Sequence, residues 1–301
     1  MRKKSAIIRI RTMIKKIILS LFLALKYIRH LQTAHYLSIV AIIKNDGNYI
    51  AEWIEYHLLV GVTKFYIYYN ESNDNIKDIL EPYIKTGIVE YKYFPGKMQQ
   101  LHAYMDALKK VRKETYWLAV IDIDEFIVPI STITVSDFLK DFEKFPRVEI
   151  NWIMYGSSGK KNKENGLVME RFKDHSSIEF NSNRCVKIII NPRFTTKIFI
   201  HNAECIFWKN NVNANKEKAV PDFLYRNGVF DKIVVNHYFT KSYEEWILRR
   251  NRDPIQNDGR PPRKIEEFHF HDRNEVKNDT IMDKYIPIIH KNLKLRYGNI
   301  Q

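Results

Sequence analysis

Residues 37 to 121 alternate between continuous apolar runs and amphipathic segments, and this alternation constrains the fold more than any other feature. The first run, residues 37–43, reads LSIVAII, a β-branched stretch typical of a strand buried on both faces. Further strands are expected at residues 64–69, 88–93 and 117–121, and helices at residues 48–60, 74–84 and 98–112. Strands joined by helices in this way predict an α/β protein with a doubly wound, mostly parallel sheet and flanking helices.

Polar clusters follow three of these strands at the points where the strands end. The clusters are Lys44-Asn45-Asp46, the segment from Asn70 to Asp74, and Asp122-Ile123-Asp124-Glu125. Ligands of doubly wound sheets bind beyond the carboxyl ends of the strands, so the clusters predict one binding site. The segment that begins at Asn70 fits contacts to a base or ribose, and it fits a turn in which Asp74 caps the next helix equally well.

The acidic pair Asp122 and Asp124 follows an apolar strand. Carboxylates one residue apart at a strand end can project toward one point, and a hard divalent cation takes one or two carboxylates together with substrate phosphates. Such a cation neutralises a diphosphate leaving group. Two alternatives remain: the acids only cap the strand end, or Asp122 is the nucleophile of a haloacid-dehalogenase-type phosphotransferase. Phe126 stands where that motif usually has Thr or Val, which argues against the second.

A second informative segment, residues 236–242, reads NHYFTKS, and Arg249 and Arg250 follow it. A histidine with a spaced lysine and an arginine cluster suits a diphosphate and its metal, which makes His237 and Lys241 candidates. If a helix starts at the end of this segment, its amino end would also face the phosphates. The alternative is a structural histidine beside cations that only solvate a surface helix.

The net charge of +14 is concentrated at the N-terminus. Residues 1–35 contain nine Lys and Arg and no acidic residue, which leaves +5 for the rest of the chain. A nucleic-acid-binding domain, the alternative that a pI of about 9.5 suggests, spreads its basic residues over a folded face. The apolar run at residues 17–25 is shorter than the roughly 20 residues of a spanning helix. We expect this leader to lie on an anionic membrane surface; a short anchor and a plain basic tail are the alternatives.

The two cysteines, Cys185 and Cys205, cannot build a disulfide framework or a Cys-x-x-Cys zinc site. Two reduced thiols suit a reducing compartment. Together with the leader, they predict a cytoplasmic protein that is peripheral on the membrane.

Six segments, taken in order, resemble family 92-type glycosyltransferases and their bacterial relatives, within the wider GT-A group. The segments are Lys44-Asn45, residues 49–57 with Gly61-Val62, residues 68–74, residues 122–126 (DIDEF), residues 156–159 (GSSG) and residues 236–242 (NHYFTKS). The resemblance covers roughly residues 37 to 250 and implies a GT-A type fold. With it the chain divides into the leader at residues 1–35, a glycosyltransferase domain at residues 36–245 and a C-terminal helical extension at residues 246–301.

The resemblance implies an inverting, Mn²⁺- or Mg²⁺-dependent transfer of a sugar from a nucleotide-diphosphate donor, such as a UDP-hexose, to a glycan or glycolipid, as in bacterial surface polysaccharide synthesis. It makes Asp124 the principal metal ligand and Asp122 a contact of the ribose or a second ligand, with His237 near the metal. The catalytic group is then Asp122, Asp124, Glu125 and Lys241. The residues expected around the nucleotide and its phosphates are Lys44, Asn45, Glu52, Asn70, Asp74, Arg249 and Arg250.

Some roles stay open on the sequence. His201 fits a structural residue as well as a ligand. Inversion needs a carboxylate near the acceptor hydroxyl, and Asp174, Glu179, Glu204 and Asp222 are all candidates for this base.

Overall fold

The computed structural model describes residues 14, 33–206, 210–219, 228–250 and 263–298. The predicted leader lies almost entirely outside these ranges, as does Asp222. Within the described ranges, no helix is long and apolar enough to cross a membrane.

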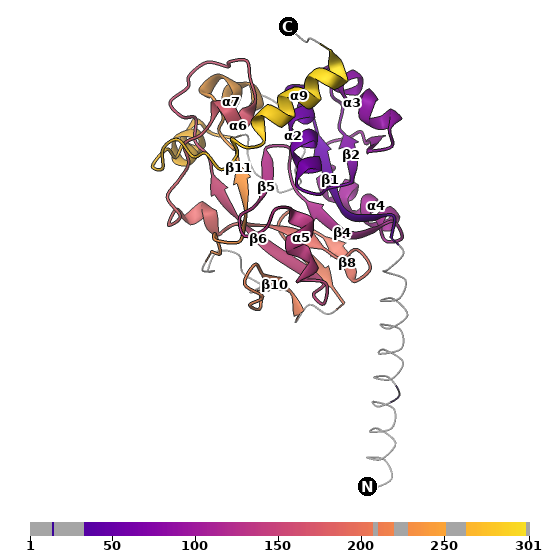
Figure 1. Ribbon diagram of the computed structural model, residues 1–301. Helices are drawn as coiled ribbons and strands as arrows, with labels where there is room; N and C mark the ends of the chain where they lie inside the picture. Colours follow the sequence, from indigo (N-terminus) through magenta and orange to yellow (C-terminus); the bar gives the residue numbers. More distant parts are fainter. Residues whose placement is uncertain (1–13, 15–32, 207–209, 220–227, 251–262, 299–301) are drawn as a thin grey trace.

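The first half of the chain forms the predicted parallel unit (Figure 1). Its elements are β1 (His35–Ile43), α2 (Gly47–Leu59), β2 (Lys64–Tyr69), α3 (Ile76–Lys85), β3 (Val89–Tyr93), α4 (Gln100–Val111) and β4 (Thr115–Val120). The four strands are parallel and lie in the order β3-β2-β1-β4. The sequence predicted every one of these elements, because each carries a long local pattern of apolar residues.

The second half adds strands of both directions to the same sheet. They are β5 (Glu125–Pro129), β6 (Arg147–Met154), β7 (Val186–Ile190), β10 (Val212–Asn213) and β11 (Ile233–His237). β7 lies antiparallel between β4 and β6, and β11 lies between β6 and an antiparallel β5. The short β10 pairs with β6, and β8 (Thr195–Ile198) forms a separate hairpin with β9 (Ala203–Cys205). The sheet is therefore mostly parallel, as predicted, with two antiparallel strands among the parallel ones.

The sequence pattern predicts strands at residues 148–155 and 186–190, which β6 and β7 confirm, but it predicts none of the other elements of this half. Those are the remaining strands together with α5 (Val135–Lys140), α6 (Val168–Arg171) and a 3₁₀ turn (Asn181–Arg184). The polar composition of residues 156–182 and 210–219 predicts loops there, but the first range contains α6 and the second contains β10. These elements are short, so they carry too few residues for a periodic pattern to stand out.

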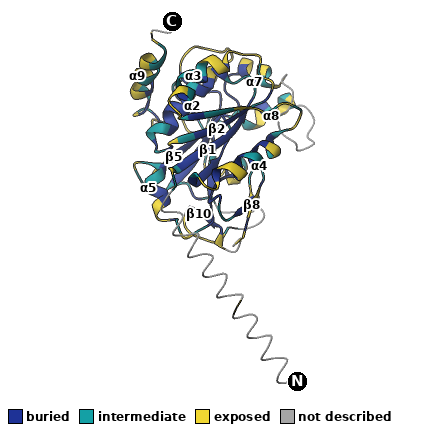
Figure 2. Ribbon diagram, turned by 90° about the vertical axis from the view of Figure 1, so that its right-hand side faces the viewer, coloured by how far each residue is buried: buried dark blue, intermediate teal, exposed yellow. Residues whose placement is uncertain are grey.

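Helices cover both faces of the central strands, which explains why the strands are apolar throughout. Successive side chains of a strand point to opposite faces. Ile39 packs in the cluster that contains α2 and α3, whereas its neighbour Val40 packs in the cluster that contains α4. The strands accordingly appear as a buried layer between helices in Figure 2. This packing leaves the carboxyl ends of the strands as the place where polar side chains gather.

The C-terminal segment returns to the first half of the chain. It contains α7 (Tyr243–Arg250), α8 (Ile265–His271) and α9 (Ile286–Tyr297), and α9 lies beside α2 and α3 (Figure 1). Arg296 and Asn292 both donate hydrogen bonds to Glu55 of α2, at 2.6 and 2.9 Å. The predicted helical extension is thus packed against the sheet domain, and the boundaries drawn at residues 35 and 245 remain predictions.

Candidate active site

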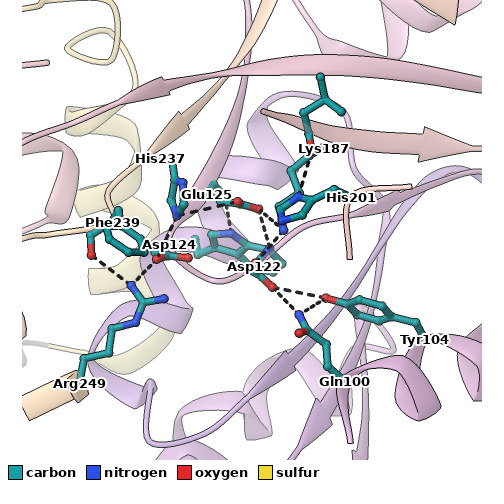
Figure 3. A network of polar contacts seen from close by, with 12 residues as sticks. Gln100, Tyr104, Asp122, Asp124, Glu125, Lys187, His201, His237, Phe239 and Arg249 are labelled. Carbon is teal, nitrogen blue, oxygen red and sulfur yellow. Dashed lines mark hydrogen bonds and ion pairs between the residues drawn. The ribbon is translucent and has the colours of Figure 1, made fainter. Parts of the chain in front are cut away.

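Side chains from five elements meet beyond the end of β4 (Figure 3). Asp122 and Asp124 lie in the turn between β4 and β5, and Glu125 is the first residue of β5. β11 pairs with β5 so that His237 lies opposite Glu125. β7 contributes a lysine and α7 an arginine to the same cluster. The predicted acidic and basic segments, more than 100 residues apart, therefore form one site.

Both carboxylate oxygens of Asp122 are engaged. Oδ1 accepts hydrogen bonds from Gln100 (3.0 Å) and Tyr104 (3.3 Å), which stand one turn apart on α4, and Oδ2 accepts one from Lys187 (2.6 Å). Burial opposes ionisation, but the Lys187 ammonium holds the pKa of Asp122 below its usual range. Asp122 is thus a fixed anion with its position set from two sides.

Asp124 is a buried anion that contacts two basic side chains. Its Oδ2 lies 2.5 Å from Nη1 of Arg249 and 3.4 Å from Nε2 of His237. Burial opposes ionisation, but Arg249 and then His237 hold the pKa of Asp124 well below its usual range. Oδ1 of Asp124 is buried and has no hydrogen-bond partner among the described residues. Burial lowers the pKa of His237, so its imidazole is neutral at physiological pH.

Glu125 contacts both the acidic turn and Lys187. Its Oε2 accepts hydrogen bonds from the backbone N–H of Asp122 (2.8 Å) and lies 3.1 Å from Nζ of Lys187. Burial raises the pKa of Glu125 to about 8, and repulsion by Asp122 and Asp124 adds to this effect. The attraction of Lys187 opposes both. The side chain is completely buried, so it fixes the turn, and the direct catalytic role expected for it stays a prediction.

Lys241 is buried, and its positive charge acts on Asp124. It has a left-handed backbone with φ of 52°, and its Nζ lies 4.6 Å from the centroid of the Tyr49 ring. Burial lowers the pKa of Lys241 to about 8, while Asp124 opposes that change. Of the two predicted arginines, Arg249 reaches the cluster, whereas Arg250 is exposed on α7.

The backbone N–H groups at the amino end of α7 are engaged within the protein, which argues against the expectation that they bind phosphate. Ser242 and Glu245 form a reciprocal cap, in which Ser242 N–H and Oγ–H donate to Glu245 and Glu245 N–H donates to Ser242 Oγ. The two N–H groups between them donate to the carbonyls of Lys160 and Lys161. All four amides are therefore used within the protein, so this helix end offers no free backbone N–H to a phosphate.

The two loops that follow β1 and β2 are joined by hydrogen bonds. Asp74 accepts one from the N–H of Gly47 at 2.8 Å, and Asn45 accepts one from the N–H of Asn73 at 2.8 Å. Asp74 thus binds the first residue of α2, while Asn75 is the cap position of α3, so the alternative in which Asp74 caps the following helix is wrong. The adjacency of the β1 and β2 carboxyl ends brings the two loops together.

Two further residues expected at the nucleotide are held by protein contacts. Asn70 is buried and donates hydrogen bonds to the carbonyls of Phe94 (2.9 Å) and Gly96 (2.6 Å). Lys44 lies 4.0 Å from the carboxylate of Glu71. Both stand at the predicted strand ends, and their contact with a nucleotide stays a prediction.

Glu52 lies inside the protein rather than at the strand ends. Its carboxylate accepts hydrogen bonds from the N–H groups of Val168 (2.7 Å) and Met169 (3.1 Å), at the start of α6. Burial raises the pKa of Glu52 to about 7, although these two hydrogen bonds oppose the change. These contacts give Glu52 a structural role that joins α2 to α6.

This burial predicts a dependence of stability on pH. The native carboxyl keeps its proton up to about pH 7, whereas the unfolded chain releases it near pH 4.5. Glu52 therefore lowers the free energy of unfolding as pH rises between these values, and adds no further change above them. In Glu52→Gln we expect stability relative to the parent to rise by on the order of 2–3 kcal/mol from about pH 4.5 to about pH 8. Urea unfolding of the parent and of Glu52→Gln at both pH values measures the difference between their free energies of unfolding. A difference that is the same at both pH values would contradict the prediction.

The sequence missed Lys187, Gln100 and Tyr104. Lys187 is the one charged residue in the run VKIII of β7, and a charge in an otherwise buried strand was a usable signal. Gln100 and Tyr104 are spaced by four on α4, but only the position of that helix shows that they face Asp122.

The residues that were left open on the sequence have separate outcomes. His201 lies beside Lys187 in Figure 3, and burial, helped by Lys187, lowers its pKa to about 3, which keeps it neutral. Asp174 accepts hydrogen bonds from Lys277 and the N–H of Asn278. Glu179 and Glu204 are exposed. None of these contacts identifies the base.

A mostly parallel sheet with an acidic pair at the end of its fourth strand, and a histidine strand beside that pair, defines an α/β protein of the GT-A type. The family model described as Glycosyltransferase family 92 matches residues 40–281, and the chain belongs to this family. Family membership argues against the haloacid-dehalogenase alternative. Both oxygens of Asp122 are hydrogen-bonded within the protein, which also disfavours Asp122 as a nucleophile.

Relatives match shorter stretches. A glycosyltransferase family 92 protein of Oryza sativa subsp. japonica is 28% identical over 116 residues, which are 38% of this chain and 20% of that protein. One of Ricinus communis is 27% identical over 108 residues, 36% of this chain and 20% of that protein. The chain thus matches about a fifth of the length of these curated relatives. Among solved structures, S. aureus TarS 1-349 has a TM-score of 0.33 at 14% identity, covering 53% of this chain and 48% of that one.

Proposed function

We propose that this protein is a metal-dependent glycosyltransferase that moves a sugar from a nucleotide-diphosphate donor to a glycan or glycolipid. The observation that carries the proposal is the meeting of Asp124 with His237 and Arg249 at the carboxyl edge of the sheet, where the charge of the buried Lys241 also acts on Asp124. An anionic metal ligand surrounded by side-chain cations suits a diphosphate, which brings its own negative charge. The donor is proposed as a UDP-hexose and the transfer as inverting, in line with the family resemblance.

The residues present fit a divalent cation. Asp124 keeps one buried oxygen without a partner among the described residues, and His237 is in the neutral form that binds metals. In the described ranges, no group of three or more His, Cys, Asp or Glu side chains is placed to hold a metal. Asp124 and His237 would therefore hold Mn²⁺ or Mg²⁺ together with phosphate oxygens and water. When bound, the cation supplies positive charge that stabilises the departing diphosphate.

Asp122 has a different place in this proposal. Lys187 and the two α4 side chains occupy its oxygens, so we assign it to contact with the ribose rather than to the metal. Lys187 also keeps Asp122 ionised, which makes it an acceptor for ribose hydroxyl groups.

A panel of nucleotide sugars tests the proposal. The purified chain is incubated with each sugar donor in Mn²⁺, in Mg²⁺ and with a chelator, and release of the nucleoside diphosphate is followed. We expect one donor to be hydrolysed with metal and to persist with the chelator. Release of no diphosphate from any donor, or release that the chelator leaves unchanged, would refute the metal-dependent transferase.

Lys241 provides a second test. Its buried ammonium stabilises charge that develops on the leaving phosphate. Lys241→Ala is therefore expected to raise the activation free energy of turnover by about 2–4 kcal/mol and to change donor affinity less. Steady-state kinetics with the donor from the panel separate the two effects, with Lys113→Ala, at an exposed lysine, as the control. Parent-like kinetics in Lys241→Ala would leave this lysine a structural role only.

We also propose that residues 1–35 hold the protein at an anionic membrane surface on the cytoplasmic side. The proposal rests on the nine basic residues around a short apolar run. Sedimentation with anionic vesicles, with and without residues 1–35, checks it, and equal pelleting of the two proteins would overturn it.

A further inference from the structure

Arg263, just before α8, is a cation with no ion pair among the described residues, although Asp124, Glu267 and Asp122 attract it from a distance. Its guanidinium carbon lies 4.6 Å from the centroid of the Phe239 ring and 5.4 Å from that of Trp246. Its Nη1 atom is buried and has no hydrogen-bond partner among the described residues. Arg263 itself is partly exposed, but a buried N–H of a cation without an acceptor is unfavourable, so Nη1 points to a missing partner.

The neighbouring charge makes this position less favourable still. The guanidinium carbon of Arg249 lies 5.6 Å from the same Phe239 centroid, so two cations share one ring. Burial, reinforced by Arg249, lowers the pKa of Arg263 to about 10. Arg249 is paired with Asp124, whereas Arg263 has no such pair among the described residues. The site therefore holds positive charge that its acidic residues leave unmatched.

Arg273 shows what a stacked arginine with a structural role looks like in the same segment. It lies 4.6 Å from the Phe180 centroid and 5.4 Å from that of Phe270, the same distances that Arg263 has from its two rings. Its Nε, however, donates to the carbonyl of Phe270 at 2.7 Å, and its Nη1 lies 3.5 Å from Glu275. Stacking alone therefore does not explain why Arg263 is left unpaired.

We infer that Arg263 binds the terminal phosphate of the donor's diphosphate together with Arg249, which packs on the same Phe239 ring. This inference rests on the proposed function and adds a phosphate ligand from the C-terminal segment. A guanidinium offers two parallel N–H groups to phosphate oxygens, and a phosphate would pair the buried Nη1. The amides at the start of α7 are already used within the protein, which favours side-chain ligands for the phosphate.

The test compares nucleoside diphosphates with monophosphates. Uridine, guanosine, cytidine and thymidine diphosphates and the matching monophosphates are titrated calorimetrically, with Mn²⁺, into the full chain, Arg263→Gln and Arg263→Lys. We expect Arg263→Gln to weaken diphosphate binding by about 10-fold or more, leave monophosphate binding within about twofold, and be partly rescued in Arg263→Lys. Arg273→Gln, the matched stacked arginine, is expected to bind both as the parent does.

A thermal melt without nucleotide separates phosphate binding from simple packing. Because Arg263 lies beside Arg249, we expect Arg263→Gln to keep or raise the parent's Tm. A lower Tm with unchanged diphosphate binding, or equal losses for diphosphate and monophosphate, would overturn the inference and leave the proposed function intact. A parent chain that binds none of the diphosphates would overturn the proposed function as well.

Discussion

Asp124→Asn is expected to lower metal-dependent turnover of the sugar donor by at least about 100-fold and to leave the fold intact. Asparagine keeps the shape of the side chain and one oxygen for Arg249. It removes the negative charge that faces Arg249 and His237 and that would hold the cation. Arg249 is partly exposed and can turn toward solvent when its partner is neutral, so the variant should still fold.

Three measurements on the purified variant decide this prediction. Turnover with Mn²⁺ gives the loss, Mn²⁺ affinity in the absence of donor shows whether the cation site is lost, and circular dichroism shows whether the fold is kept. Asp141→Asn is the matched control, because it removes the same charge from a carboxylate that is 78% exposed and only loosely paired with Lys216. An undiminished rate with Mn²⁺ in folded Asp124→Asn would remove Asp124 from the mechanism.

Lys187→Met should have the largest effect on stability. The ammonium is 1% exposed and lies 2.6 Å from Asp122 and 3.1 Å from Glu125. Methionine fills a similar volume but leaves buried carboxylates without a partner, a change that typically destabilises a protein by about 3–5 kcal/mol. Donor turnover is expected to fall too, because Asp122 loses the contact that holds its Oδ2.

The loss should depend on pH with a definite sign. Without Lys187, the native pKa values of Asp122 and Glu125 rise, so the folded variant binds more protons than the unfolded chain and becomes less stable as pH increases. Urea unfolding at about pH 5 and about pH 8 is expected to show the larger deficit at the higher pH. Adding Glu125→Gln to Lys187→Met should recover part of the lost stability at the higher pH.

Lys110→Met provides the comparison for Lys187→Met. Lys110 pairs with Glu90 at the surface, where such pairs contribute about 1 kcal/mol or less. A deficit in Lys187→Met no larger than in Lys110→Met, or one that does not change with pH, would mean that Lys187 is not the counter-ion of the acidic pair.

The sequence by itself determined the parallel half of the fold and the position of the candidate site at the edge of the sheet. The strand-helix alternation follows from the local periodicity of apolar residues, which predicts β1 to β4 and the helices between them. Asp122 and Asp124 had to lie at the carboxyl edge because they follow the last of these strands. His237 and Arg249 were recognised as partners by residue type and by resemblance alone.

The tertiary structure decided which side chains touch. Lys187 stands 65 residues from Asp122, and the antiparallel entry of β7 next to β4 brings them together. His237 reaches Asp124 through the register of β11 on β5, and Arg263 reaches the site through the return of the C-terminal segment. Strand order and register depend on long-range packing that no window of sequence contains. Periodicity therefore located the site, while its ionic contacts followed only from the way distant strands pair.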